Sequence, residues 1–87
     1  MADPVRVAIA GAAGRMGKML IESVGKEPGA VVSGALERPG FSALGQDAGV
    51  MAGVGELGVP LSDDLAAVVD TADVLIDFTI ADATETN

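Results

Sequence analysis

The segment VRVAIAGAAGRMG, residues 5–17, decides the expected fold of this 87-residue chain. Residues 5–10 form a short apolar run rich in β-branched side chains, which predicts a buried strand. Glycines follow at positions 11, 14 and 17, and the apolar side chains beyond them have a helical spacing. The sequence therefore predicts a strand, a tight glycine-rich turn and a helix in direct succession.

The rest of the chain continues this alternation of strands and helices. Residues 30–36 and 74–78 predict two further strands, and residues 58–61 predict a short strand at the edge of the sheet, because Pro60 has no N–H to donate. A helix is expected to begin with Ser62 as its N-cap and to run to about Asp70. The order predicts an α/β fold, a Rossmann-type parallel sheet of about four strands with two to three helices. Residues 81–87 look like the first turns of another helix, so we expect the sheet to be incomplete.

Specific side chains are expected to face the core. In the first helix these are Met16, Met19, Leu20, Ser23 and Val24, and in the later helix they are Leu65, Val68 and Val69. Residues 39–58 contain six glycines and no sustained period, which predicts a long, largely irregular excursion in place of a second helix. Leu44 and Met51 are the expected anchors of this excursion.

Composition excludes several classes of function. The net charge of −8 is unfavourable for nucleic acid and for anionic membranes. The chain has no cysteine and no histidine, so it lacks disulfides, thiolate metal sites and the commonest general base. Its apolar runs are too short for a signal peptide or a membrane span, so we expect a cytoplasmic location and a small-molecule ligand.

The glycine-rich turn predicts a dinucleotide site. Glycines permit the tight turn, the approach of a pyrophosphate to the backbone and close packing of helix on strand, and the helix N-terminus attracts phosphate. The spacing is G-x-x-G-x-x-G, with Ala12 where the usual motif has glycine. A tight turn that binds nothing is the alternative interpretation.

Two residues at the end of the second predicted strand fit the adenosine end of such a cofactor. Glu37 lies 20 residues after Gly17, where an acid accepts hydrogen bonds from the ribose hydroxyls. Arg38 would pair with a 2′-phosphate or stack on adenine. The alternative is a solvated Glu-Arg pair at a strand end. Arg15 and Lys18 place further positive charge near the same end. Chance placement on exposed positions is the alternative, and Lys18 is better explained as ordinary helix surface.

The end of the fourth predicted strand also lies beside the first strand in such a sheet. Phe78 would pack near the cofactor or belong to the core, and Asp77 is better explained as the cap of the following turn than as a site carboxylate.

Four segments resemble the dihydrodipicolinate reductases of bacterial lysine biosynthesis. They are VAIAGAAGRMG at 7–17, ALER at 35–38, LGQDAG at 44–49 and VLIDFT at 74–79, in the family's order. The resemblance implies a two-domain, cytoplasmic, usually tetrameric enzyme that reduces the product of dihydrodipicolinate synthase with NADPH or NADH. It also implies that the cofactor loop is Gly11 through Met16, the ribose acid Glu37 and its neighbouring arginine Arg38.

The family's catalytic histidines and lysine lie downstream of the position that corresponds to Asn87. Residues 1–87 are therefore expected to be the N-terminal part of the dinucleotide-binding domain, inactive alone, with no catalytic or metal-binding residue. The alternatives are a non-catalytic nucleotide-sensing module and the N-terminal half of another NAD(P)-dependent dehydrogenase. The full set of expected cofactor contacts is Gly11, Ala12, Ala13, Gly14, Arg15, Met16, Gly17, Glu37, Arg38 and Phe78.

Overall fold

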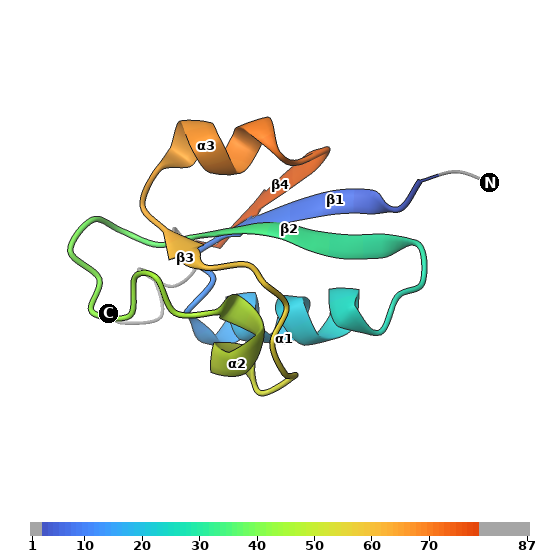
Figure 1. Ribbon diagram of the computed structural model, residues 1–87, viewed down its shortest axis with the longest axis horizontal. Coiled ribbons are helices and arrows are strands. Elements are labelled where there is room, and N and C mark those ends of the chain that lie inside the picture. The colour runs from blue at the N-terminus through green and yellow to red at the C-terminus, as the bar shows by residue number, and fades with distance from the viewer. Residues whose placement is uncertain (1–2, 79–87) are drawn as a thin grey trace.

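The computed structural model describes residues 3–78, so the helix expected from residue 81 lies outside the described residues. The elements are β1 (Val5–Ala10), α1 (Arg15–Gly25), β2 (Ala30–Leu36), α2 (Ala48–Ala52), β3 (Leu61–Ser62), α3 (Leu65–Asp70) and β4 (Val74–Asp77). The strands form one sheet in the order β3-β2-β1-β4, and every neighbouring pair is parallel. Helices α1 and α2 lie on one face and α3 on the other (Figure 1). This arrangement confirms the expected Rossmann-type fold.

Strand β1 is the central element of the sheet. Its last four residues are buried, and Ile9 is fully enclosed between β2 and β4. The apolar run that marks this strand in the sequence is explained by this position, because a strand with neighbours on both sides and helices on both faces has little contact with water.

The helical period of α1 is as predicted, but only part of the expected core face is buried. The buried residues are Gly17, Ile21 and Val24, whereas Met16 is 41% exposed and Met19 is 64% exposed. Of the other residues expected on the core face, Val24 is buried and Leu20 packs against the core as predicted, whereas Ser23 is exposed. The prediction missed Ile21, which is fully buried, and Gly17, which has no side chain to mark the position where the helix approaches the glycine turn.

Helix α3 and the strand before it also differ from the expected details. Ser62 belongs to β3 and pairs with Leu36, and Asp64 is the true N-cap, accepting a hydrogen bond from the Ala67 N–H at 3.1 Å. The strand begins at Leu61 and lies at the edge of the sheet as expected, but it starts three residues later than predicted.

Only Val68 of the three residues expected to face inward from α3 is buried. Leu65 is 53% exposed and Val69 is 44% exposed. Helix α3 approaches β2 at Gly34, where an added Cβ would lie 2.9 Å from the Val68 side chain. Helix α3 therefore packs on the sheet mainly through the contact between Val68 and Gly34, and not through the broader apolar face that the sequence predicted.

The excursion between β2 and β3 is more ordered than the sequence predicted. It contains α2, and Leu44 and Met51 pack against the core as expected. Asp47 organises this segment, because its carboxylate accepts hydrogen bonds from the N–H groups of Val50 at 3.0 Å, Leu57 at 2.9 Å and Val59 at 2.9 Å. One side chain therefore caps α2 and ties the segment that follows the helix back to its start.

These bonds predict a pH dependence of stability. They lower the pKa of Asp47 to about 2 from the ordinary 3.8, the bond from Leu57 contributing most. A lowered pKa means that this contribution is complete above the ordinary value and is lost as the pH falls through about 2. We expect Asp47→Asn to lower the thermal unfolding midpoint at neutral pH, and the difference from wild type to shrink between pH 4 and about 2.

Thermal unfolding of both proteins across this pH range is the measurement. Asp63→Asn, which changes an exposed carboxylate on the turn before α3, is the control and should leave the midpoint at neutral pH unchanged. A difference between Asp47→Asn and wild type that is independent of pH would contradict the assigned role of Asp47.

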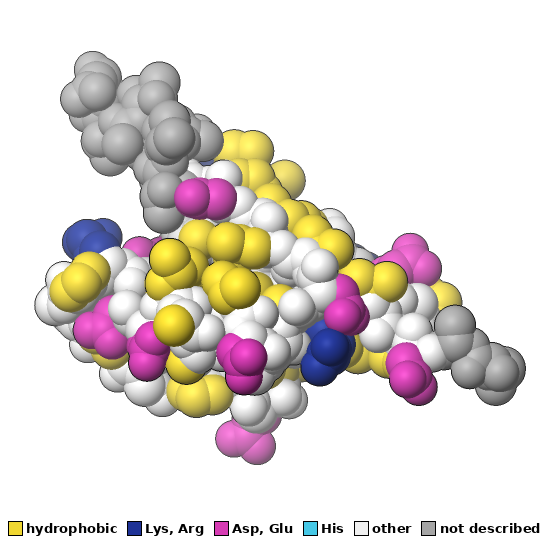
Figure 2. Space-filling model, turned by 90° about the horizontal axis from the view of Figure 1, so that it is seen from above, with side chains coloured by type: hydrophobic (Ala, Val, Ile, Leu, Met, Phe, Trp, Pro, Cys, Tyr) yellow, Lys and Arg dark blue, Asp and Glu magenta, His cyan; other side chains and the backbone are white. Residues whose placement is uncertain are grey.

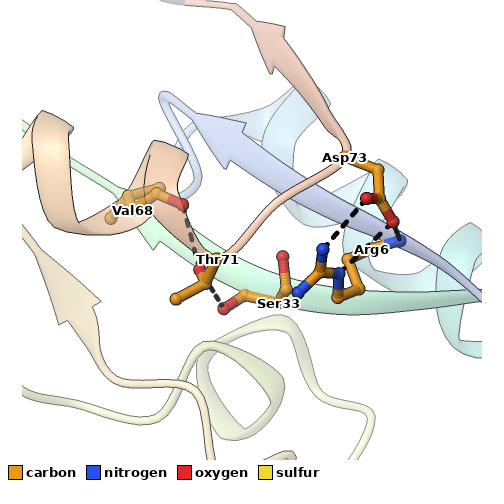
Figure 3. A network of polar contacts seen from close by, with 5 residues as sticks. All are labelled: Arg6, Ser33, Val68, Thr71 and Asp73. Carbon is orange, nitrogen blue, oxygen red and sulfur yellow. Dashed lines mark hydrogen bonds and ion pairs between the residues drawn. The ribbon is translucent and has the colours of Figure 1, made fainter.

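Polar contacts connect neighbouring segments at the end of the sheet where β1 and β4 begin (Figure 3). The guanidinium of Arg6 pairs with the carboxylate of Asp73 at 3.1 Å, and the Arg6 N–H donates to the same carboxylate at 2.9 Å. Hydrogen bonding from Arg6 lowers the pKa of Asp73. The Thr71 hydroxyl donates to the Val68 carbonyl at 3.0 Å. Arg6, one of the five basic residues, thus has a structural role at the end of β1 opposite the glycine turn.

The face of the sheet that carries α3 is partly apolar at its surface. Figure 2 is seen from this side and shows hydrophobic side chains gathered on it with acidic side chains around them. The exposed apolar residues of α3 and β4 include Leu65, Val69, Val74 and Leu75. Among residues 3–78, α3 is the only helix on this face (Figure 1).

Candidate dinucleotide-binding site

Three chain segments meet at the carboxyl end of the sheet. They are the glycine turn after β1, Glu37 after β2 and Phe78 after β4. Strands β2 and β4 lie on opposite sides of β1, so the chain leaves this end of the sheet in two directions. Ligands of open α/β sheets bind at such a switch point.

The glycine turn has a defined backbone geometry. Gly11 has a φ of +77°, a conformation that side chains strongly disfavour. The N–H groups of Gly11 and Ala12 both donate to the Leu36 carbonyl, at 2.9 and 3.2 Å, and the Gly14 N–H donates to the Gly11 carbonyl at 3.0 Å. These bonds fasten the turn to the end of β2 and set the direction in which α1 starts.

Gly17 is required by packing. A Cβ at this position would lie 2.7 Å from the Cα of Ala12 and would overlap the Gly11 carbonyl oxygen. Both contacts are with backbone, which cannot move aside as a flexible side chain can. Gly14, by contrast, has extended angles of −72° and 170° that any residue adopts. The backbone conformation at this position therefore does not require glycine.

The first turn of α1 suits an anion. Its N-cap is Gly14, which supplies no capping side chain, and there is no acidic residue in the first turn. The N–H groups of a first turn have no acceptor within their own helix, and the helix dipole is positive at this end. A pyrophosphate can therefore fill a role that a capping side chain fills in α2 and α3.

Glu37 lies against the glycine turn. Its Oε2 accepts a hydrogen bond from the Ala13 N–H at 2.7 Å, and its side chain is only 8% exposed. The interpretation of Glu37 as a solvated strand-end residue is therefore wrong. Its second oxygen, Oε1, lies 3.9 Å from Nη1 of Arg38, so the two residues form a loose ion pair.

Arg38 lies at the surface, against the ring of Phe41. Its side chain is 73% exposed, and its guanidinium lies over the ring of Phe41 with Cζ 4.9 Å from the ring centre. The Glu37 side chain is thus buried against the glycine turn, whereas that of Arg38 is largely exposed. Phe41 was not predicted as a contact of Arg38. Its position three residues later, in a turn closed by the hydrogen bond from the Phe41 N–H to the Arg38 carbonyl, is the signal that would have indicated it.

Phe78 lies between the candidate site and the core. Its N–H donates to the Ala10 carbonyl at 2.9 Å, and its half-buried side chain packs against the core cluster. Together with Met16, Met19, Leu20 and Ser23 it lines an open depression of about 210 Å³. Phe78 therefore packs on the core and also reaches the start of α1 at Met16, so both interpretations of this residue remain compatible with its position.

The other charged residues expected near the site lie on α1 and β4. Arg15 and Lys18 are exposed on α1, and Asp77 pairs with Ala10 at the end of β4. The cap expected for Asp77 would involve residues outside the described range. Residues 3–78 contain no cluster of three or more acidic, cysteine or histidine side chains placed to hold a metal ion. No helix among the described residues is long and apolar enough to cross a membrane.

The parallel sheet and the glycine turn at its switch point define a Rossmann-type α/β domain. More particularly, the chain belongs to the family described as "Dihydrodipicolinate reductase, N-terminus", whose model matches residues 5–87.

Curated relatives agree with this family. The chain is 64% identical over 75 residues to the 4-hydroxy-tetrahydrodipicolinate reductase of Geobacter metallireducens, covering 86% of this chain and 28% of that protein. It is 57% identical over 79 residues to the reductase of the same name from Alkalilimnicola ehrlichii, covering 91% of this chain and 30% of that protein. The chain thus spans less than a third of the length of these relatives.

Proposed function

We propose that this chain binds the NADPH or NADH of a 4-hydroxy-tetrahydrodipicolinate reductase, as the N-terminal part of its dinucleotide-binding domain. The observation that carries the proposal is the contact between Glu37 and the Ala13 N–H at 2.7 Å. This contact joins Glu37, the residue expected to bind the ribose, to the glycine turn, which is expected to bind the pyrophosphate. Family membership favours a reductase over the nucleotide-sensing module and over other dehydrogenases.

The donors and acceptors present fit such a cofactor. The uncapped first turn of α1 would take the pyrophosphate, and Gly11 and Gly14 would let it approach the backbone. The ribose hydroxyls would donate to Glu37, whose Oε2 is engaged by the loop while Oε1 faces Arg38. When bound, the nicotinamide supplies the hydride for the reduction. Phe78 and Met16 would flank the cofactor at the end of β4.

The other parts of the reaction are proposed to reside elsewhere in the whole protein. Residues 1–87 contain no histidine, and the curated relatives are more than three times as long as the segment they share with this chain. We propose that the substrate is bound and protonated by residues outside this segment. A cytoplasmic homotetramer is proposed for the whole enzyme on family resemblance alone.

A paired enzyme assay tests this division. The full-length protein should oxidise NADPH or NADH in the presence of 4-hydroxy-tetrahydrodipicolinate, while purified residues 1–87 should give no turnover above the background without enzyme. Turnover by residues 1–87 would show that a catalytic group lies within this segment. A folded full-length protein that is inactive with both cofactors would contradict the reductase proposal.

A further inference from the structure

Phe41 is fixed in place independently of any ligand. Its side chain is half-buried and packs against the core cluster, and its N–H donates to the Arg38 carbonyl at 3.2 Å. The ring is therefore held from the core side and by a turn that begins at Arg38 itself.

Among residues 3–78, the Arg38 side chain contacts the Phe41 ring and, at longer range, the Glu37 carboxylate. The Arg38 side chain is 73% exposed, and its distance of 3.9 Å to the Glu37 carboxylate is long for a directed ion pair. A long exposed side chain loses considerable rotamer entropy when a ligand orders it. The ring under the guanidinium reduces that loss, because one position is already favoured by the attraction between cation and ring face.

The stacked geometry leaves the guanidinium able to bind. Its N–H groups lie in the plane of the group, so a ring against one face does not use them. They can pair with a phosphate in the two-point manner typical of arginine. Glu37 beside them is committed to the glycine turn through Oε2, so it does not neutralise Arg38 by close pairing.

We infer that Phe41 is a positioning residue that holds Arg38 for the 2′-phosphate of NADPH and so raises the affinity for NADPH relative to NADH. This inference rests on the proposed function. It predicts an effect on the ratio of the two dissociation constants, which a general loss of folding would not produce.

The test measures the Kd of NADPH and NADH for variants of the full-length protein by calorimetry at one ionic strength. Phe41→Leu keeps the apolar packing and removes the ring face. We expect it to raise the Kd of NADPH about two- to fivefold, equivalent to about 0.5–1 kcal/mol, and that of NADH by less. Phe41→Tyr keeps a ring and should restore the wild-type ratio. Met51→Leu, a change within the same excursion at another core contact, should leave the ratio unchanged.

A double-mutant cycle with Arg38→Ala separates positioning from indirect effects. If Phe41 acts through Arg38, Phe41→Leu has no further effect on NADPH binding once Arg38 is alanine. Equal losses for both cofactors, or the same loss in both backgrounds, would overturn the inference. Failure of the wild-type protein to bind either cofactor would instead refute the proposed function, so the two failures are distinguishable.

Discussion

Replacing Gly17 by alanine is expected to abolish dinucleotide binding by the full-length protein. The new Cβ would lie 2.7 Å from the Cα of Ala12 and would overlap the Gly11 carbonyl, so α1 must move away from the glycine turn. Overpacking of this kind costs about 1–3 kcal/mol or more. Because α1 presents its first turn to the proposed pyrophosphate position, its displacement removes the anion site as well.

Gly25→Ala is the matched control on the same helix. A Cβ at Gly25 would meet nothing within 4 Å, and alanine is the better helix former. Circular dichroism should therefore show Gly25→Ala folded, and calorimetry should give the wild-type Kd. A Gly17→Ala protein that is folded and binds both cofactors with unchanged affinity would show that the turn and helix do not need this close approach.

Removing the carboxylate of Glu37 should weaken the binding of both cofactors and change the ratio of their dissociation constants. Glu37→Ala leaves the Ala13 N–H without its acceptor and removes the proposed ribose contact. Hydrogen bonds to charged groups contribute about 1.5–3 kcal/mol, so we expect Kd values about ten- to a hundredfold higher. The effect should be larger for NADH, because in the proposed site its 2′-hydroxyl would donate to the carboxylate, whereas the 2′-phosphate of NADPH would be repelled by it.

Calorimetry with both cofactors measures this effect. Glu56→Ala removes an exposed carboxylate between α2 and β3 and is the control for the change in net charge. An unchanged NADH affinity in Glu37→Ala would mean that this carboxylate stabilises the glycine turn but does not bind the cofactor. The predicted change in cofactor ratio is opposite in sign to that of Phe41→Leu, so the two experiments check each other.

The fold was predictable from sequence because its strongest signals are local. A strand, a glycine turn and a helix within residues 5–25 define the central β1–α1 unit, and apolar runs mark β2 and β4. On α1 the spacing of apolar residues predicted the burial of Val24 but not that of Gly17, which has no side chain to mark where the helix comes closest to the glycine turn.

The order within residues 39–60 depends on contacts between residues distant in sequence. Asp47 binds Leu57 and Val59, ten and twelve residues away, and no local pattern indicates those partners. In the candidate site, too, some features were predictable from local sequence and others were not. Spacing from the glycines placed Glu37 at the site, whereas its bond to Ala13 and the ring beneath Arg38 required the three-dimensional structure.

A crystal structure of the full-length protein with bound NADPH tests the central claim most directly. We expect pyrophosphate oxygens at hydrogen-bonding distance, about 2.7–3.2 Å, from N–H groups of the glycine turn and the first turn of α1. We also expect the adenosine ribose beside Glu37 and the 2′-phosphate on Arg38. A dinucleotide bound away from residues 11–17, with Glu37 making no contact to it, would contradict the proposed site.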